Sequence, residues 1–393
     1  MTISYAGRFS RLLLRWKASL WKSIWRQLVL FLIFYYLIAA FYRFGLRDLP
    51  DERRTFAELV RYLDESTSSS IPISFLLGLY VVTIVKRWWE QFENIAWPDN
   101  FLYFVSAYFV GDDDETRIIR RNIARYCVLA AVLAWRNVSI RVLKRFPTAD
   151  HLSTIGLMTQ EECRIYKHST APFGRWFLPI NWIQSKIMEA SSAQRLNPNQ
   201  TNHLLTALHA YKDKFIRLFV FDWVPIPLVY TQVCTVATYG YFALCLVGRQ
   251  HVDEDLPGRV HKLNIYFPIF TVLEFLFYMG WLTVAEHLMH PFGEEDDDFE
   301  LNYILDRHLY VSLMIVDQMH GQMPRDSFNF KDAFWDTEPW LPHTKASERI
   351  KDRKPHTHFG AAIPFQEMEL VRSCSTDPSF QDQITKRNNQ SRN

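Results

Sequence analysis

Four stretches of the chain are almost free of charged residues, and each is about as long as a membrane crossing requires. They cover residues 28–42, 66–85, 223–248 and 265–285, and Glu274 is the one charge inside them. A helix that crosses the hydrocarbon core of a bilayer needs about 20 predominantly apolar residues. The pattern therefore predicts four transmembrane helices, joined by segments that carry most of the charge.

Glu274 has two interpretations. An ionisable side chain inside a membrane helix is costly, and it normally faces protein or water instead of lipid. Glu274 is therefore expected either to form a hydrogen bond at a helix interface or to line a polar cavity.

Basic residues predict the orientation of these helices. Residues 1–27 contain lysine and arginine but no acidic residue, and the segment 86–222 contains the basic runs RIIRRNIAR and RVLKR. Because lysine and arginine are enriched on the cytosolic side of membranes, both segments are expected there. Residues 43–65 and 249–264 would then lie outside, and the C-terminus would lie in the cytosol of a multi-pass protein of the cell membrane.

The segment 86–222 is predicted to form soluble helices. Its apolar run at 126–135 is too short to span a bilayer and is expected to be a buried helix. The acidic residues of GDDDET, at 111–116, precede RIIRRNIAR. Carboxylates at this place favour the start of a helix, because they accept hydrogen bonds from free amides and oppose the helix dipole.

Composition excludes several classes of protein. The net charge of +2 over 393 residues does not indicate a nucleic-acid binder. The five cysteines are odd in number and form no CxxC, so neither a disulfide framework nor a zinc cluster is indicated. The sequence has no phosphate loop, no Gly-rich dinucleotide turn and no GxSxG, so it is not expected to be an enzyme.

One face of the second apolar stretch is a candidate pore lining. Ser70 and Pro72 favour the start of a helix at this point. Ile71, Phe75 and Leu79 then fall on one face, four residues apart. Such a stripe commonly packs against another helix. In several copies it would instead form apolar rings that gate by dewetting, and the positive edges of the aromatic rings would tolerate an anion.

The stretch HPFGEEDDDFE, at 290–300, places five carboxylates in a row after the fourth apolar stretch. Ca²⁺ prefers about six to eight oxygen ligands from carboxylates and carbonyls, and the bend at Pro291 and Gly293 exposes carbonyls. The spacing is not that of an EF-hand loop. The alternatives are a solvated acidic run and a transition-metal site at His287 and His290, for which no third ligand is defined.

Six longer motifs are specific enough to compare with known families. They are FSRLLLRWKASLWK, IPISFLLGLYVVTIVKRWWEQFENIAWPD, LKRFPT, FDWVPIPLVYTQV, LVGRQ and GWLTVAEHLMHPFGEEDDDFE. They resemble the bestrophin family of anion channels, from the N-terminus to about residue 365. The resemblance implies an all-α membrane protein with four transmembrane helices per subunit, a large helical cytosolic domain and a homopentamer around a central pore. It also implies a chloride channel, opened by cytosolic Ca²⁺ and permeable to bicarbonate.

The resemblance assigns roles to particular residues. The pore neck falls on Ile71, Phe75 and Leu79, where Leu79 replaces a residue that is usually aromatic in vertebrate members. The cytosolic aperture falls on Asn199, a polar amide where the best-known members have an aliphatic residue. Both differences are expected to alter anion preference.

The family's Ca²⁺ clasp falls on the acidic stretch. Its aligned positions are His287, His290, Glu295 and Asp298, and the leader adds a carbonyl near Ala6. Here His290 replaces asparagine and Glu295 replaces aspartate. Because imidazole is a poor ligand for a hard cation, His290 would bind Ca²⁺ through its backbone carbonyl.

The chain is thus predicted to have six parts. They are a basic leader (1–27), two transmembrane helices with the neck at 71–85 (28–85), a cytosolic helical region (86–222), two further transmembrane helices (223–286), the acidic clasp with cytosolic helices (287–350), and a regulatory or disordered tail (351–393). The expected ligands and partners are calcium, permeant chloride, membrane lipid and identical subunits. The alternatives are a membrane scaffold that regulates other channels and a metal-dependent membrane enzyme that uses His287 and His290.

Overall fold

The computed structural model divides the chain into two units, Met1–Gln322 and Met323–Asn393. In the first unit it describes residues 12–322 except 14, 71, 171–172 and 253–266. In the second unit it describes 323–324, 331–332, 334–336, 343–345 and 347, none of which lies in a helix or strand. The predictions for the leader around Ala6 and for the tail after residue 350 fall outside the described residues.

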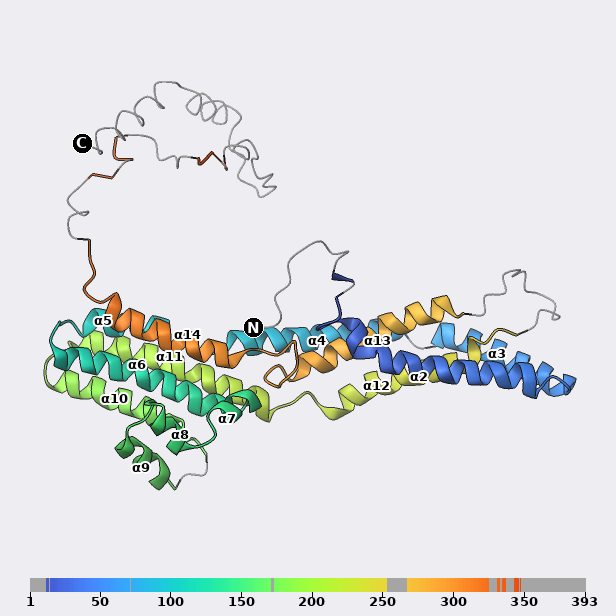
Figure 1. The fold of residues 1–393 in the computed structure, drawn as a ribbon, viewed down its shortest axis with the longest axis horizontal. Coiled ribbons are helices and arrows are strands. Elements are labelled where there is room, and N and C mark those ends of the chain that lie inside the picture. The colour runs from blue at the N-terminus through green and yellow to red at the C-terminus, as the bar shows by residue number, and fades with distance from the viewer. Residues whose placement is uncertain are drawn as a thin grey trace. The chain divides into compact units, whose positions relative to one another are not determined.

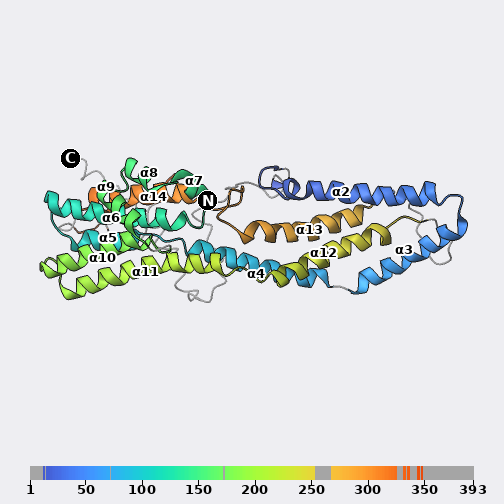
Figure 2. The ribbon, with the colours of Figure 1, turned by 90° about the horizontal axis from the view of Figure 1, so that it is seen from below.

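The described residues of the first unit form helices and no strand, as the sequence predicts. One group contains long apolar helices and the partly charged helices that accompany them (Figure 1). Its members are α2 (Leu20–Ala40), η1 (Phe41–Gly45), α3 (Pro50–Ser70), α4 (Ile73–Glu93), α12 (Leu228–Gly248) and α13 (Ile269–Met289). Figure 2 shows α2, α12 and α13 running side by side.

The apolar helices pack through aromatic side chains. Phe31 of α2 meets Phe275 of α13 with ring centroids 4.9 Å apart, and Phe242 of α12 meets Phe275 at 4.8 Å. These rings belong to one buried cluster with Leu77 and Ile84 of α4. The cluster fixes α4 against α13, so the candidate pore helix is held by the helix that leads into the acidic stretch.

The second group of helices corresponds to the predicted soluble region. Its members are α5 (Asp99–Tyr108), α6 (Asp114–Trp135), α7 (Ile140–Arg145), α8 (Ala149–Thr154), α9 (Gln160–His168), α10 (Phe177–Ser192), α11 (Pro198–Trp223), α14 (Leu301–Leu313) and η2 (Met314–Gln318). α6 packs against both α10 and α14, and residues 127–135 are all buried. The apolar run at 126–135 is therefore the buried C-terminal half of α6, as predicted.

Local sequence explains where several of these helices begin. The carboxylate of Asp113 accepts a hydrogen bond from the Thr116 amide at 2.9 Å, which confirms the predicted start of α6. α11 begins with a capping box, in which Asn197 and Gln200 each accept a hydrogen bond from the other's amide. Pro198 occupies the first turn, where its missing N–H removes no helical hydrogen bond.

Three helices in the described part of the chain are long and apolar enough to cross a membrane: Leu20–Gly45, Leu228–Gly248 and Ile269–Met289. They correspond to the first, third and fourth predicted spans. The first starts at Leu20, so it takes in Lys22 and Arg26 of the predicted leader. The second predicted span is not among them.

The second predicted span contains a boundary between two helices. α3 ends at Ser70 and α4 begins at Ile73. Pro72 occupies the N-cap position of α4, whereas Ser70, the residue expected to cap this helix, is the last residue of α3. α4 then continues to Glu93 and includes Lys86, Arg87 and Glu90, which explains why length and apolarity alone do not mark it as a membrane helix.

The segment 43–65 contains a helix that the sequence patterns did not reveal. α3 packs along α12 and buries Ala57 and Val60. A Cβ added at Gly248 of α12 would lie 3.2 Å from the backbone nitrogen of Asp64, so the two helices come very close at this point. The few buried positions of α3 are interspersed with charged residues of both signs, so the sequence pattern did not predict this helix.

Glu274 forms a hydrogen bond at a helix interface, which is the first of its two interpretations. The hydroxyl of Tyr241 donates to Glu274 Oε2 at 2.9 Å, and Arg249 Nη2 lies 3.9 Å from Glu274 Oε1. Arg249 Nε also lies 3.3 Å from Asp64 Oδ1. The charge in α13 is therefore paired within the protein.

Four of the five cysteines lie in the described residues. Cys127, Cys163, Cys234 and Cys245 are buried free thiols in the described residues. Cys374 lies outside the described residues.

His308 of α14 makes the stability of the soluble group depend on pH. The side chain is fully buried, and its Nε2 lies 2.9 Å from the carbonyl of Ala96. Burial lowers the pKa of His308 to about 4. An unfolded chain takes up this proton below pH ~6.5, whereas the folded chain does so only near pH 4. Stability is therefore expected to fall by about 2 kcal/mol between pH 7.5 and pH 5.

Thermal unfolding of the purified protein at these two pH values measures the effect of His308. His308→Gln is expected to reduce the loss, and His209→Gln, an exposed histidine on α11, is expected to leave it unchanged. An identical loss in both variants would contradict the assignment.

Candidate pore helix and acidic loop

α4 has two apolar faces of which only one is covered. Ile73, Leu77 and Ile84 are at most 3% exposed and pack in the aromatic cluster described above. On the opposite face Phe75 is 66% exposed and Leu79 is 51% exposed. The face that these two side chains share is therefore not covered by the rest of the chain. Ile71, the third predicted neck residue, lies outside the described residues.

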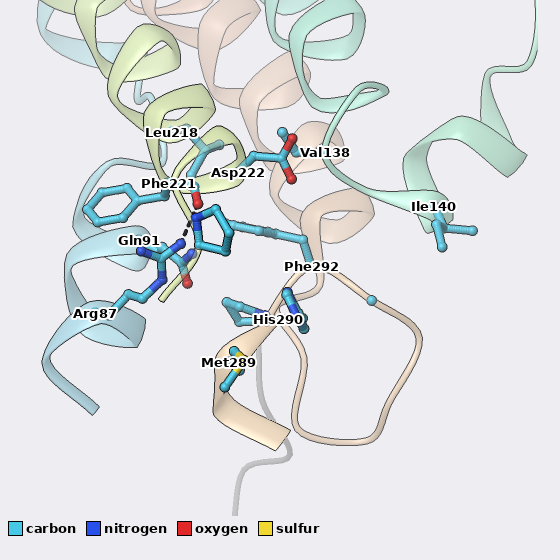
Figure 3. A pocket seen from close by; sticks show the side chains of 13 residues that line it. Arg87, Gln91, Val138, Ile140, Leu218, Phe221, Asp222, Met289, His290 and Phe292 are labelled. Atoms are coloured by element: carbon cyan, nitrogen blue, oxygen red, sulfur yellow. Dashed lines mark hydrogen bonds between the residues drawn. The ribbon is translucent and has the colours of Figure 1, made fainter. Parts of the chain in front are cut away.

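Arg87 joins α4 to the end of α11, a contact that sequence reasoning missed. Its Nη1 donates to the carbonyl of Val224 at 3.0 Å, and its Nη2 donates to the carbonyl of Phe221 (Figure 3). The carbonyl of Phe221 lies in the last turn of α11, which ends at Trp223, and that of Val224 lies just beyond it, so neither accepts a helical hydrogen bond. The only sequence signal was an arginine just beyond an apolar stretch, which does not identify its partner.

The acidic run is bridged to basic side chains from three helices. Asp296 pairs with Lys22 of α2 at 2.6 Å. On α7, Lys144 pairs with Glu294, and Arg141 pairs with Glu300, which follows the run two residues later. The Glu295 carboxylate bonds to His287 of α13. Much of the repulsion between neighbouring carboxylates is thus relieved within the protein.

Asp298 differs from the rest of the run because it is buried, with 2% of its surface exposed. Its Oδ2 accepts a hydrogen bond from the Glu295 amide at 2.6 Å. Burial raises the pKa of Asp298, with a smaller opposing effect from that hydrogen bond. A buried carboxylate is stable in its charged form only when a positive charge or several donors compensate it.

The bend before Asp298 brings a backbone carbonyl toward the same place. A Cβ added at Gly293 would lie 2.9 Å from Asp298 Oδ2 and 3.7 Å from the carbonyl oxygen of His290. Only glycine leaves this space free. The oxygen atoms around it belong to a carboxylate and a carbonyl, which are the ligands that Ca²⁺ prefers.

Asp297 is a further carboxylate that sequence reasoning did not select. It has no hydrogen bond or ion pair to any of the described residues. Partial burial raises its pKa; the nearby His287 opposes this rise, and the charges of Asp296 and Glu295 add to it. A bound cation would therefore reduce the energetic cost of negative charge most at Asp297 and Asp298.

The other predicted clasp residues are placed differently. His287 and Glu295 are bonded to each other through one oxygen of the Glu295 carboxylate, Oε2. Within the described residues, no group of three or more His, Cys, Asp and Glu side chains is arranged to hold a metal ion. A cation at this loop would therefore depend on backbone carbonyls as well as on Asp298.

Asn199, the predicted cytosolic aperture, is exposed in the first turn of α11. It directly follows Pro198 and lies two residues after the capping residue Asn197. The capping box therefore holds the backbone that carries Asn199, while its own amide faces away from the buried side of α11.

Comparisons with known proteins agree with these features. Residues 1–318 match the protein family described as "Bestrophin, RFP-TM, chloride channel". The chain is similar to Bestrophin homolog 14 of Caenorhabditis elegans, with 43% identity over 373 residues that cover 95% of this chain and 89% of that protein. It is 42% identical to human Bestrophin-1 over 381 residues, which cover 94% of this chain and 64% of the human protein.

A crystal structure of a bacterial bestrophin homolog from Klebsiella pneumoniae has a similar fold. The TM-score is 0.55 at 17% sequence identity, and the match covers 75% of this chain and 98% of that chain. At this identity the similarity concerns the helical fold alone.

Proposed function

Because this chain belongs to the bestrophin family, a family of membrane chloride channels, we propose that it forms an anion channel opened by cytosolic calcium. The single observation that carries the proposal is the exposed apolar face of α4, where Phe75 and Leu79 remain uncovered opposite a fully buried face. No covalent chemistry is part of the function.

The exposed face of α4 is suited to a pore that several subunits share. One chain contributes one Phe75 and one Leu79, so a ring requires identical neighbours, and we place five subunits around the axis. A ring of apolar side chains closes a narrow pore by excluding water. The edges of the Phe75 rings carry partial positive charge and favour a passing anion. α4 supplies the fourth membrane helix in this arrangement, because neighbouring subunits and water cover its polar residues.

Calcium would act at the acidic loop. Asp298, Asp297 and the carbonyl of His290 supply hard oxygen ligands at the foot of α13, which ends at Met289. α13 packs along α4 in the aromatic cluster. A cation that draws the loop together would therefore shift α13 and, through it, the neck. Both chain termini and the soluble helices would lie in the cytosol of a cell-membrane protein.

A membrane scaffold with little conductance of its own is the second candidate. The bond between His287 and Glu295 favours it, because this bond occupies one of the predicted calcium ligands. Under this alternative the acidic loop is a purely structural link between α2, α7 and α13.

Anion flux into liposomes that contain the purified full chain separates the two candidates. We expect calcium-dependent flux of chloride and bicarbonate that exceeds the flux into protein-free liposomes. Flux at the protein-free level, with and without calcium, would refute the channel and support the scaffold.

A further inference from the structure

Lys86 lies on the same face of α4 as the proposed neck residues Phe75 and Leu79. An α-helix turns by about 100° per residue, so a residue eleven positions further along points within about 20° of the first. Lys86 is eleven positions after Phe75, and Val82 lies between them on this face. Phe75, Leu79 and Val82 are each more than half exposed, and the side chain of Lys86 is 77% exposed. The uncovered face of α4 therefore continues from an apolar part to a positive charge.

The ammonium group of Lys86 is only weakly engaged within the chain. Its neighbour Arg87 donates two hydrogen bonds to carbonyls at the end of α11, so that charge is fixed in a contact between helices. Lys86 instead pairs with Glu90 of the same helix, with Nζ 3.9 Å from Oε1. Both side chains of this pair are exposed, and such pairs contribute little because water screens them. The charge of Lys86 is therefore available to an ion in front of this face.

Lys86 is the charge on α4 that lies nearest to the neck. No charged residue precedes it in α4, and it follows Leu79 by about 10 Å along the helix axis. Glu90 and Glu93 follow Leu79 by about 16 Å and 21 Å. In physiological salt a charge is screened over about 8 Å, so at Leu79 the potential from Lys86 is about twice that of the two carboxylates together. The net potential that α4 adds at the inner end of the neck is therefore positive.

We propose that Lys86 forms a ring of ammonium groups at the cytosolic end of the neck, which concentrates chloride there and makes the pore prefer anions. This inference rests on the proposed channel, in which the uncovered face of α4 lines the axis and each subunit contributes one lysine. Rings of lysine or arginine give anion pores their selectivity. Within the narrow pore, charges of one sign raise the local concentration of the opposite ion. Lys86 thus adds charge selection to a neck that is otherwise apolar.

The conductance of single channels formed by the unmodified full chain provides the first test. We compare symmetric chloride at about 0.15 M and about 0.01 M, where the screening length grows from about 8 Å to about 30 Å. A ring of fixed positive charge keeps chloride concentrated at the neck when the bulk concentration falls. The conductance should therefore fall by less than about fivefold, although the salt falls about fifteenfold. A conductance that falls in proportion to the salt would overturn the ring.

Lys86→Gln removes the charge at nearly the same side-chain length. We expect the single-channel conductance to fall at least about twofold at 0.15 M salt, and by a larger factor at 0.01 M because screening is weaker there. Lys86→Arg should restore the conductance that Lys86→Gln loses. The matched control is Lys186→Gln on α10, which removes an exposed lysine that pairs with Glu189 on its own helix, and its conductance should equal that of the unmodified channel.

The outcomes separate the ring from the channel itself. Equal conductance of Lys86→Gln and the unmodified channel at both salt concentrations would overturn the ring and leave the channel intact. A loss that does not depend on salt, or that Lys86→Arg does not restore, would also overturn it, because a purely structural role of the side chain has these properties. Absence of chloride current from the unmodified protein would refute the proposed channel and, with it, the ring.

Discussion

Asp298→Asn is expected to abolish the activation of chloride current by micromolar cytosolic calcium. The substitution keeps the shape of the side chain and an oxygen that accepts from the Glu295 amide, so the loop should stay folded. It removes the buried negative charge that a hard cation needs, and the charge of the ligands sets calcium affinity over orders of magnitude. We therefore expect the calcium concentration for half-activation to rise by at least about 100-fold.

The matched control for Asp298→Asn lies in the same acidic run. Glu294→Gln removes an exposed carboxylate that pairs with Lys144 on the surface, and it should shift the half-activating concentration little. Unfolding measured without calcium should show that Asp298→Asn is at least as stable as the unmodified protein, because burial disfavours the charged form. Normal calcium activation in a folded Asp298→Asn variant would contradict the account of the loop.

The double substitution Phe75→Ala with Leu79→Ala is expected to produce current without calcium. Both side chains are more than half exposed within one chain, so their loss should not disturb its core. It would widen the apolar rings, let water enter and remove the dewetting barrier. We expect the current at nominally zero calcium to match the calcium-activated current of the unmodified channel, as measured in excised patches.

Val236→Ala is the control for the neck. Val236 is 70% exposed on α12, a different helix from the one that carries Phe75 and Leu79. Its replacement should leave the current at zero calcium unchanged. A double variant that stays closed without calcium would place the gate elsewhere.

Local signals in the sequence predicted much of the soluble fold. The carboxylates before α6 and the uninterrupted apolar run at its end each specify their own structure, because capping and burial act within a few residues. α3 was missed for the opposite reason. Its buried positions are few and include Ala57 and Val60, which pack against α12. Charged residues between them obscure the apolar pattern in the sequence.

The candidate site was predicted only in part, since it depends on contacts between distant segments. The exposed face of α4 follows from helical periodicity, which places Phe75 and Leu79 together. Three features can be recognised only in the tertiary structure. They are the pairing of Glu295 with His287, the burial of Asp298 and the hydrogen bond from Arg87 to the end of α11. Sequence spacing identifies an acidic run, but it does not reveal which carboxylates already have a partner.

We propose that calcium at the acidic loop opens an anion-selective pore lined by α4. Recording from excised patches while cytosolic free calcium is stepped from nominally zero to micromolar tests it most directly. We expect a chloride current that rises with calcium and falls again when calcium is removed. A chloride current of constant size at every calcium concentration would contradict it.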